Sequence, residues 1–486
     1  MLFNGGQPVF WSRMVNFGFF VQDDWRVSRK LVLNLGLRND RYGHYGPHER
    51  YTSQPAGLFN MDGLIDAVHF VWGAPRDPLK PFNSDSISLG PRFGFAYTAD
   101  SQGDFVVRGG FGVNFQGFDL QSYETQVTRP NTPRSRTFSR AESAALGLKW
   151  PFYNGDIADR VQADAMANPQ LASATRDNPN TKPPYAMNYT LGIQRALTSS
   201  LVLETAFVGT RGVKFNMTRT ANQLDRITGL RPNQNDIQVN YIDNSQQTNF
   251  NSWQTSLRQR MTYGLLFNAH YTWGKALSYT GGDTGHGSYG DTRGGIEDFD
   301  NVKIERSLST GDVAHSLVLD WVYQAPTPFP NSPVARHLLG GWQFSGIWRA
   351  QTGVPIGVTQ TGGRPDIVDI EGAVNTNCCS FGNLQYLNRA AFQLVPISTP
   401  SSRTVRRGHA GPAPFRGPGS SNVDISLGKS FSLGERRRLE LKTDMTNIFN
   451  HTQYTDISTN LANVEFGQAI GTKAARIIQV QLRFAF

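Results

Sequence analysis

One short run of glycine, lysine and serine has residue types that could bind phosphate. Gly428, Lys429 and Ser430 match the end of a phosphate-binding loop, in which the lysine contacts phosphate and the hydroxyl contacts magnesium. However, Val423 stands where the first glycine of that loop is required, and the segment alternates like a strand. No complete GxSxG pattern occurs in the 486 residues either. The sequence therefore predicts no catalytic site and a protein that is not an enzyme.

Cysteine and histidine are the other residue types that could hold a metal or form a cross-link. The two cysteines of the sequence, Cys378 and Cys379, are adjacent, and they supply neither a disulfide framework nor the four ligands of a structural zinc site. We expect incidental loop cysteines or a locally strained pair. His44 and His48 have a spacing that would bring them together on a helix, but Pro47 and nearby glycines argue against a helix there.

Acidic residues gather in and after a glycine-rich stretch at residues 281–295. Oxygen ligands of this kind could hold a hard cation such as calcium. A mobile, polar outer loop is the favoured interpretation, so the sequence predicts no metal and no cofactor. The residues concerned are Asp283, His286, Asp291, Glu297, Asp298 and Asp300.

The chain is basic, with a formal net charge of +9. This charge is scattered along the sequence, and no helical motif that binds nucleic acid bases accompanies it. We therefore expect no nucleic acid partner. Arg403, Arg406 and Arg407 form a small cluster that could contact the phosphates of lipopolysaccharide. A solvated loop is the favoured interpretation of that cluster.

Composition limits the elements that could position any site. Hydrophobic residues make up 38%, charged residues 17% and aromatic residues 12%, and there are 49 glycines. This excludes a coiled coil, and the aromatic content excludes simple disorder. There is no apolar run of about 18 residues, which excludes a transmembrane helix. A transmembrane strand remains allowed, because it needs only about 10 residues with one apolar face.

Apolar and polar residues alternate with a period of two along most of the sequence. This pattern predicts about thirteen strands, each long enough to cross a bilayer when the strand is tilted. Leu31, Leu33, Leu35 and Leu37 share one face of the first clear example. The other predicted strands include Phe17–Trp25, Phe93–Tyr97, Phe105–Phe115, Tyr189–Arg195, Leu201–Phe207, Trp253–Gln259, Leu265–Trp273, His315–Tyr323, Trp342–Trp348, Val423–Leu427, 438–445 and 478–486.

The two faces of these strands differ in the same way along the whole chain. One face carries Leu, Phe, Val and Trp, and the other carries Arg, Asp, Gln, Asn and His. A barrel with lipid outside and water inside requires this pattern, because all backbone groups must be paired and only the outer face meets hydrocarbon. Trp25, Trp273, Trp321 and Trp348 lie near strand ends, where their rings suit the headgroup level. For any one of them, an ordinary core position is an equal alternative.

Short and long connections alternate through six cycles. Outer-membrane barrels have short periplasmic turns and long extracellular loops, whereas a soluble sandwich has no reason to keep this order. The expected short connections are 27–29, 99–103, 198–200, 261–263 and 430–436, with 325–340 intermediate in length and rich in proline. The expected long connections are 43–89, 117–185, 210–251, 275–313, 352–420 and 448–474.

This alternation also predicts the direction of the strands. The last strand follows an outer loop and leaves Phe486 on the periplasmic side, and counting back places the N-terminus on the outer side. A complete single-chain bacterial barrel has an even number of strands and both termini inside. Residues 1–486 are therefore expected to be the C-terminal part of a larger barrel. Leu2–Phe10 does not read as a signal peptide, which agrees with this expectation.

Several motifs, taken in order, resemble TonB-dependent receptors of the Oar-like group, which usually carry an N-terminal carboxypeptidase-regulatory-like domain. Each motif is degenerate alone, but their order is fairly specific and covers nearly the whole chain. The motifs are Gly18–Trp25, Leu33–Arg38, Pro91–Tyr97, Arg108–Gly112, Leu339–Gly346, Thr352–Pro355, Arg416–Gly419, Asn422–Ser426, Asn447–His451 and Arg476–Phe486.

The resemblance implies an all-β, up-and-down antiparallel barrel in the cell outer membrane, with about 13 or 14 strands here out of about 22. It implies capture of a bulky ligand by outer loops and import with energy from TonB. The regulatory-like domain, the plug, the TonB box and the signal peptide are not in this chain, so TonB would act only through the missing plug. Phe486 resembles the signal read by the barrel-insertion machinery, and lipid and lipopolysaccharide are expected partners.

Two other functions stay open at this point. One is a passive porin-like or structural outer-membrane barrel. The other, which is less favoured, is a secreted soluble β-protein that binds glycans through its aromatic residues, and it would purify without detergent. The sequence does not identify the ligand, nor whether the chain closes into a barrel, because loops set specificity and carry little readable code.

Overall fold

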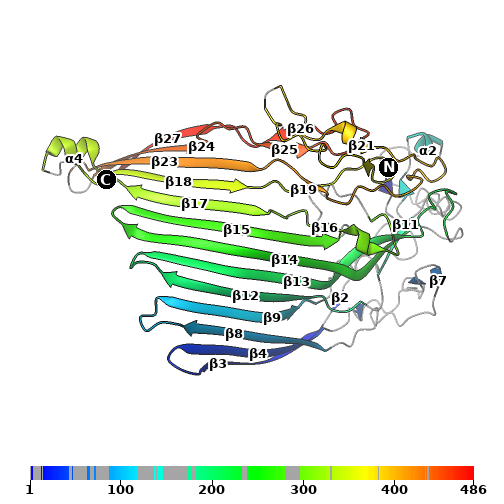
Figure 1. Ribbon diagram of the computed structural model, residues 1–486, viewed down its shortest axis with the longest axis horizontal. Helices are drawn as coiled ribbons and strands as arrows, with labels where there is room; N and C mark the ends of the chain where they lie inside the picture. Colours follow the sequence, from blue (N-terminus) through cyan, green and yellow to red (C-terminus); the bar gives the residue numbers. More distant parts are fainter. Residues whose placement is uncertain are drawn as a thin grey trace.

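The computed structural model describes most of the strands and the loops that connect the last of them (Figure 1). The described residues are 15–42, 87–117, 181–232, 238–279, 296–328, 331–380, 382–432, 434 and 437–486, together with the short segments 2–3, 12–13, 46–47, 63–65, 70–72, 136–137, 140–145 and 173–177.

One large antiparallel sheet forms the body of the molecule. Within the described part of the chain, thirteen strands lie side by side in sequence order, as the alternation predicts (Figure 1). They are β3 (Asn16–Arg26), β4 (Leu31–Tyr42), β8 (Ser88–Thr98), β9 (Phe105–Phe115), β12 (Tyr185–Ala196), β13 (Leu201–Ala221), β14 (Gln238–Thr262), β15 (Leu265–Tyr279), β17 (His315–Gln324), β18 (Trp342–Gln351), β23 (Ser420–Ser432), β24 (Arg438–Thr446) and β27 (Ile477–Ala485).

Short connections lie at one end of this sheet, which we call the turn end, and long connections lie at the other, which we call the loop end (Figure 1). The tightest turn joins β14 to β15 through Tyr263 and Gly264, both with positive φ, as the hairpin twist requires. The widest connection at the turn end joins β17 to β18 and contains α4 (Pro333–Leu339). The turns and loops lie at alternate ends as predicted, but the predicted long connection 210–251 is mostly strand, and residues 222–237 alone connect β13 to β14.

Strand register separates the side chains onto two faces, because residues directly opposite each other in neighbouring strands share a face. Phe207, Trp253 and Trp273 are opposite one another across β13, β14 and β15 and lie on the apolar face. One residue further along, Ala206, Gln254 and Thr272 form the corresponding row on the polar face.

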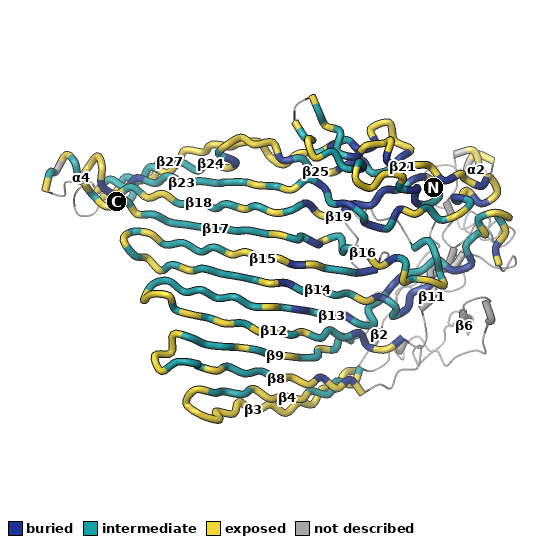
Figure 2. The backbone as a smooth tube through the Cα atoms, viewed as in Figure 1, coloured by how far each residue is buried: buried dark blue, intermediate teal, exposed yellow. Residues whose placement is uncertain are grey.

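The apolar face is not covered by a second layer. Val480 is 65% exposed and Phe484 51% exposed, and most of the wall is exposed or half-buried (Figure 2). Leu31, Leu33, Leu439 and Leu441 lie on this face as well. They do not meet across a dry centre, as they would in a soluble sandwich. All four tryptophans expected near strand ends, Trp25, Trp273, Trp321 and Trp348, also lie on the apolar face.

The sheet has two open edges in the part of the chain that is described. β3 and β27 are its outermost strands and do not pair with each other. Every residue of β3 and almost every residue of β27 is exposed. Closure, which the sequence left undecided, does not occur between these two strands.

The main hydrophobic cluster of the described residues lies in the loops, while Met217, Tyr241 and Ile242 are buried in the loop-end extensions of β13 and β14. Residues between β18 and β23 pack against residues between β24 and β27 at the loop end. We call this the loop core. Its fully buried members include Val358, Leu387 and Leu461, and the ring of Phe392 is nearly perpendicular to the rings of Phe415 and Phe466. Here the chain forms β19 (Pro355–Ile356), β20 (Asp366–Ile367), η5 (Arg389–Ala391), β21 (Phe392–Gln393), β22 (Phe415–Arg416), β25 (Tyr454–Ile457) and β26 (Ala469–Thr472).

Shorter elements complete the described structure. β11 (Ser173–Asp177) pairs in parallel with β14, and η4 (Val302–Glu305) leads into β16 (Arg306–Leu308), which pairs with β15. The rest are β1 (Leu2–Phe3), β2 (Ser12–Arg13), β5 (Gly46–Pro47), β6 (Gly63–Ile65), β7 (Phe70–Trp72), β10 (Arg136–Thr137) and α2 (Arg140–Ala145). None of the helices that can be described is long and apolar enough to span a membrane.

Candidate functional site

The polar face of the sheet is lined by hydrogen-bonded polar and charged side chains. Asn34 donates to Asp24 at 2.6 Å, and Arg108 donates to Gln194 at 2.7 Å. Similar pairs continue to the other edge of the sheet. These are Arg92 with Asn114, Asn268 with Asp320, Asn422 with Asp424, and Lys442 with Asp444. The polar face can therefore line an aqueous space while few of its charges lack a partner.

Loops from separate hairpins are joined at the loop end. The Ser401 hydroxyl, from the loop after β18, donates to the Arg226 carbonyl in the loop after β13 at 2.8 Å. The Arg403 guanidinium crosses the same boundary and donates to the Leu224 carbonyl at 2.9 Å. In return, Arg226 donates to the Thr404 carbonyl at 3.1 Å. We call this contact the loop junction.

A small polar cavity of about 280 Å³ opens at the loop junction. Arg226, Arg364 and Arg403 line it together with Glu297, which comes from the loop after β15. Three hairpins therefore contribute charged side chains to one cavity. Such a cavity suits a polar or anionic group.

Buried charge pairing holds these side chains in place. Glu305 is fully buried and forms an ion pair with Arg364 at 2.5 Å. Its other carboxylate oxygen accepts a hydrogen bond from the Glu297 backbone N–H at 3.0 Å. Glu297 in turn pairs with Arg226 at 3.4 Å. Breaking a buried pair by removing one partner is costly, so this network fixes the relative positions of the loops.

Arg403 lies among charges of both signs. Burial lowers the pKa of its guanidinium, and the nearby positive charge of Arg226 lowers that pKa further. The carboxylates of Glu297, Asp225 and Asp298 act on that pKa in the opposite direction to Arg226. An anionic group bound in the cavity would relieve the effects of burial and of Arg226.

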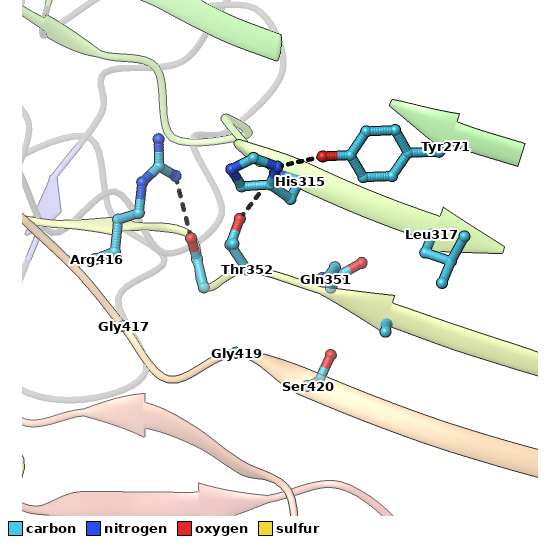
Figure 3. A pocket seen from close by; sticks show the side chains of 11 residues that line it. Tyr271, His315, Leu317, Gln351, Thr352, Arg416, Gly417, Gly419 and Ser420 are labelled. Carbon is cyan, nitrogen blue, oxygen red and sulfur yellow. Dashed lines mark hydrogen bonds between the residues drawn. The ribbon is translucent and has the colours of Figure 1, made fainter. Parts of the chain in front are cut away.

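A second cavity, of about 520 Å³, lies on the apolar face where β18 and β23 diverge (Figure 3). Tyr271 and His315 line it, and the Tyr271 hydroxyl is hydrogen-bonded to His315 Nδ1 at 2.7 Å. The His315 ring is also parallel to the ring of Trp273, with their centroids 6.5 Å apart. Arg416 points into the same region and is paired with Asp312. We call this the rim pocket.

Lys429 does not lie in a phosphate-binding loop. It lies in β23 on the apolar face, where its ammonium group contacts the rings of Trp342 and Phe431. That ammonium donates to the Gly340 carbonyl at the turn end. Gly428 and Ser430 lie on the opposite face. The prediction that this run does not bind phosphate as a loop agrees with this arrangement.

The arginine cluster at residues 403–407 is partly solvated, and each of its three arginines has partners in other segments. Arg406 forms two hydrogen bonds with Asp366, at 3.0 and 2.5 Å, and Arg407 pairs with Asp298 at 3.4 Å. Arg403 is held at the loop junction. Arg406 and Arg407 therefore remain partly exposed to solvent, but they pair with carboxylates from distant segments, which the local sequence does not show.

Asp366 gives the loop region a pH-dependent contact. The Arg406 guanidinium, helped by the His409 backbone N–H, holds the pKa of Asp366 at about 2, below its ordinary value of 3.8. A carboxyl group with a lowered pKa stabilises the fold above its ordinary pKa, and this contribution is lost as the pH falls toward 2.

We expect Asp366→Asn to loosen the loop between β18 and β23 by about 1 kcal/mol at pH 7, since Arg406 is half exposed and solvent screens the pair. Hydrogen exchange of this loop, corrected for intrinsic rates, should be faster in the variant at pH 7 and equal to wild type near pH 2. A difference of the same size at both pH values would contradict the assigned charge pairing.

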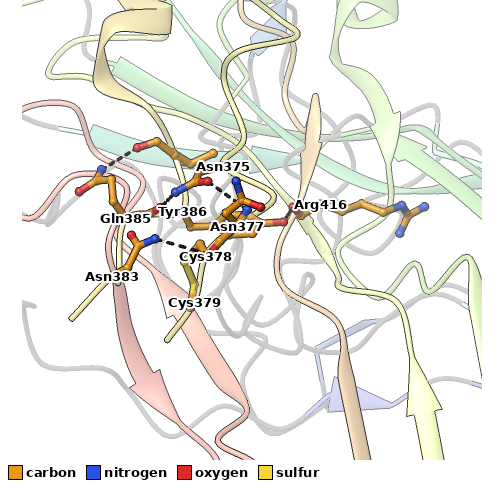
Figure 4. Close-up of a disulfide and its surroundings, with 9 residues drawn as sticks. Asn375, Asn377, Cys378, Cys379, Asn383, Gln385, Tyr386 and Arg416 are labelled. Atoms are coloured by element: carbon orange, nitrogen blue, oxygen red, sulfur yellow. Dashed lines mark hydrogen bonds between the residues drawn. A yellow bond between two sulfur atoms is a disulfide. The ribbon is translucent and has the colours of Figure 1, made fainter. Parts of the chain in front are cut away.

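The two cysteines are joined to each other by a disulfide (Figure 4). This is the locally constrained pair among the alternatives that the sequence allows. Cys379 packs against the loop core, and the Cys378 N–H donates to the Asn375 carbonyl at 3.2 Å. The nearby Tyr386 hydroxyl donates to the Arg416 carbonyl at 2.7 Å. The disulfide thus belongs to the packing of the loops.

The proposed metal ligands are mostly outside the described residues. His44, His48 and residues 281–295, with Asp283, His286 and Asp291, cannot be placed. Glu297 lies at the loop junction, and Asp298 pairs with Arg407. In the part of the chain that is described, no three His, Cys, Asp or Glu residues gather closely enough to hold a metal ion.

A single uncovered sheet with one apolar and one polar face, short turns at one end and long loops at the other, defines the wall of an outer-membrane β-barrel. The chain belongs to the family described as "Outer membrane beta barrel domain", which matches residues 4–479. Its place is the outer membrane. The apolar face therefore meets lipid, the polar face meets the interior, and the loop end is extracellular. No curated protein sequence matches the chain.

Several solved structures of outer-membrane receptors and transporters are similar to this chain at low sequence identity. The outer membrane transporter YddB from Escherichia coli is 10% identical with a TM-score of 0.48, and the match covers 97% of this chain and 45% of that one. The ferripyoverdine receptor of Pseudomonas aeruginosa is 12% identical with a TM-score of 0.45, over 98% and 39%. The ferric-catecholate import receptor Fiu from E. coli is 13% identical with a TM-score of 0.43, over 98% and 45%. The chain thus spans less than half the length of these proteins.

Proposed function

We propose that this chain forms the wall and the extracellular surface of a receptor that captures a bulky ligand and delivers it into the barrel for TonB-dependent import, as the C-terminal part of a longer protein of the Oar-like group. The order of the motifs in the sequence supports the group. The loop junction carries the rest of the proposal.

The physical argument concerns preorganisation. Loops that are ordered before binding lose less conformational entropy when a ligand arrives. Here the loops after β13, β15 and β18 share one charged cavity, and the loop core fixes the loops after β18 and β24 to each other. A passive pore needs only an open mouth and gains nothing from a cross-braced surface above it.

The polar face supports the second half of the proposal. Its paired side chains, such as Asn268 with Asp320, offer hydrogen bonds to a polar ligand that passes along the wall. At the turn end, β27 presents exposed Phe484 and Phe486, which suit recognition by the barrel-insertion machinery during assembly.

Uptake by the source bacterium tests the proposal. We expect deletion of the coding sequence to abolish uptake of one class of bulky nutrient, among labelled ferric chelates and oligosaccharides, and a protonophore to abolish the same uptake in wild-type cells. Uptake that depends on the protein but resists the protonophore would favour the passive barrel. Unchanged uptake of every class would contradict a role in import.

A further inference from the structure

The rim pocket lies at the level where the membrane ends. Strand register places Tyr271 opposite Leu317, and Leu317 opposite Ala350, all on the apolar face. Two residues closer to the loop end, Trp273 is opposite His315 on the same face. Beyond this row, on the same face, Asn251 is opposite Lys275, so polar residues replace apolar ones. The pocket therefore opens toward lipid at the extracellular boundary of the apolar band, where tryptophan and tyrosine favour the headgroup level.

The lining of the rim pocket changes from apolar to polar in the direction of the membrane normal. Leu317 and its register partner Ala350 form the side that faces the bilayer centre, whereas Thr352 and Arg416 lie at the loop end. Leu317, Thr352 and Arg416 can be followed in Figure 3. A soluble ligand has no need of an apolar side that opens into hydrocarbon. A lipid has this polarity, with acyl carbons below and a headgroup above.

Two hydrogen-bond donors are held ready at the polar side. Arg416 is anchored by Asp312 and by the Gly353 carbonyl, which its Nη1 contacts at 3.2 Å. Its Nε–H has no acceptor among the described residues. When the Tyr271 hydroxyl donates to His315 Nδ1, the imidazole proton resides on Nε2, which has no partner in the same part of the chain. Stacking on Trp273 keeps the ring in this orientation.

Charge narrows the choice of lipid. Asp312 balances the charge of Arg416, but the planar guanidinium still offers a donor that matches a phosphate oxygen, and Lys275 adds a positive charge at the same boundary. We propose that the rim pocket binds a phosphate of lipopolysaccharide in the outer leaflet, with His315 and Arg416 on the phosphate and the first acyl carbons against Leu317 and Ala350. This inference rests on the outer-membrane location and not on the proposed import function, so either can fail alone.

The test uses the full chain, purified from outer membranes in mild detergent and freed of endogenous lipid. Binding is measured for bis-phosphorylated lipid A, for dephosphorylated lipid A and for inorganic phosphate. His315→Phe keeps the aromatic stack and removes Nε2, and Arg416→Gln removes the charge. His337→Phe, in α4 at the turn end, is the matched control. Heat-modifiable migration on a detergent gel shows whether each variant is folded.

We expect lipid A to bind wild type and His337→Phe equally, and each rim-pocket variant to lose about tenfold in affinity, as expected for one hydrogen bond to a charged group. Dephosphorylated lipid A should bind wild type with the same loss. Because Arg416→Gln also removes an anchor of the loop, His315→Phe decides the matter if the first variant does not fold. Equal binding of the two lipids, equal binding by wild type and His315→Phe, or binding of free phosphate as tight as that of lipid A would overturn the proposal.

Discussion

Leu191→Arg is expected to destabilise the inserted protein by about 2–4 kcal/mol, which is the cost of an arginine on the lipid face near the middle of a bilayer. Leu191 lies in the middle of β12, in the interior of the sheet, and 56% of its surface is exposed on the apolar face. In a soluble β-protein such an exposed position would tolerate arginine at almost no cost. The fraction of heat-modifiable protein in outer-membrane extracts, followed through increasing urea, measures the loss.

The neighbouring residue supplies the control. Thr190 is also exposed, but it lies on the polar face, between Gly110 and Val208 of the adjacent strands. Thr190→Arg should change stability by less than about 0.5 kcal/mol, as is usual for a solvated surface position. Equal effects of the two arginines would mean that both faces meet the same medium, and the outer-membrane topology would fail.

The second large effect is expected in the loops. Leu387 is completely buried in the loop core, and Leu387→Ala should cost about 2–5 kcal/mol because it leaves a cavity. This loss should be local, since no residue of the large sheet belongs to the loop core. We therefore expect rapid proteolysis of the loop between β18 and β23 while heat-modifiable migration is retained.

Leu384 offers a matched comparison in the same loop, because it is 39% exposed. Leu384→Ala should leave the proteolysis rate near that of wild type. Ligand uptake should fall in Leu387→Ala cells and persist in Leu384→Ala cells, because the proposed capture depends on ordered loops. Uptake at the wild-type level in cells with a proteolysed loop would separate the loop core from ligand capture.

The wall could be predicted from the sequence because its signal is local. Phe105–Phe115 alternates over its full length, and β9 has the same bounds. Other strands are longer than their apolar pattern. The predicted strand Leu201–Phe207 continues as β13 to Ala221, beyond the reach of hydrocarbon, where pairing with β14 holds the backbone without any need for an apolar face.

The loop region could not be predicted in the same way. Leu387 and Leu461 pack together from different connections, and neither lies in a periodic segment. Likewise, nothing near Arg403 indicates that Leu224 and Glu297 accept its hydrogen bonds. The only available signal was the gathering of apolar residues in long connections that were expected to be polar.

The unpaired outer edges of β3 and β27 have a consequence for how the protein enters its membrane. A lone row of amide and carbonyl groups facing acyl chains has no water to satisfy it, and each group costs several kcal/mol there. A sheet with two such open edges would be unstable in a bilayer, even though its two faces match lipid and water. We therefore expect membrane insertion and strand pairing to occur together. The edge strands β3 (Asn16–Arg26) and β27 (Ile477–Ala485) would form backbone hydrogen bonds with further strands as the sheet enters the lipid.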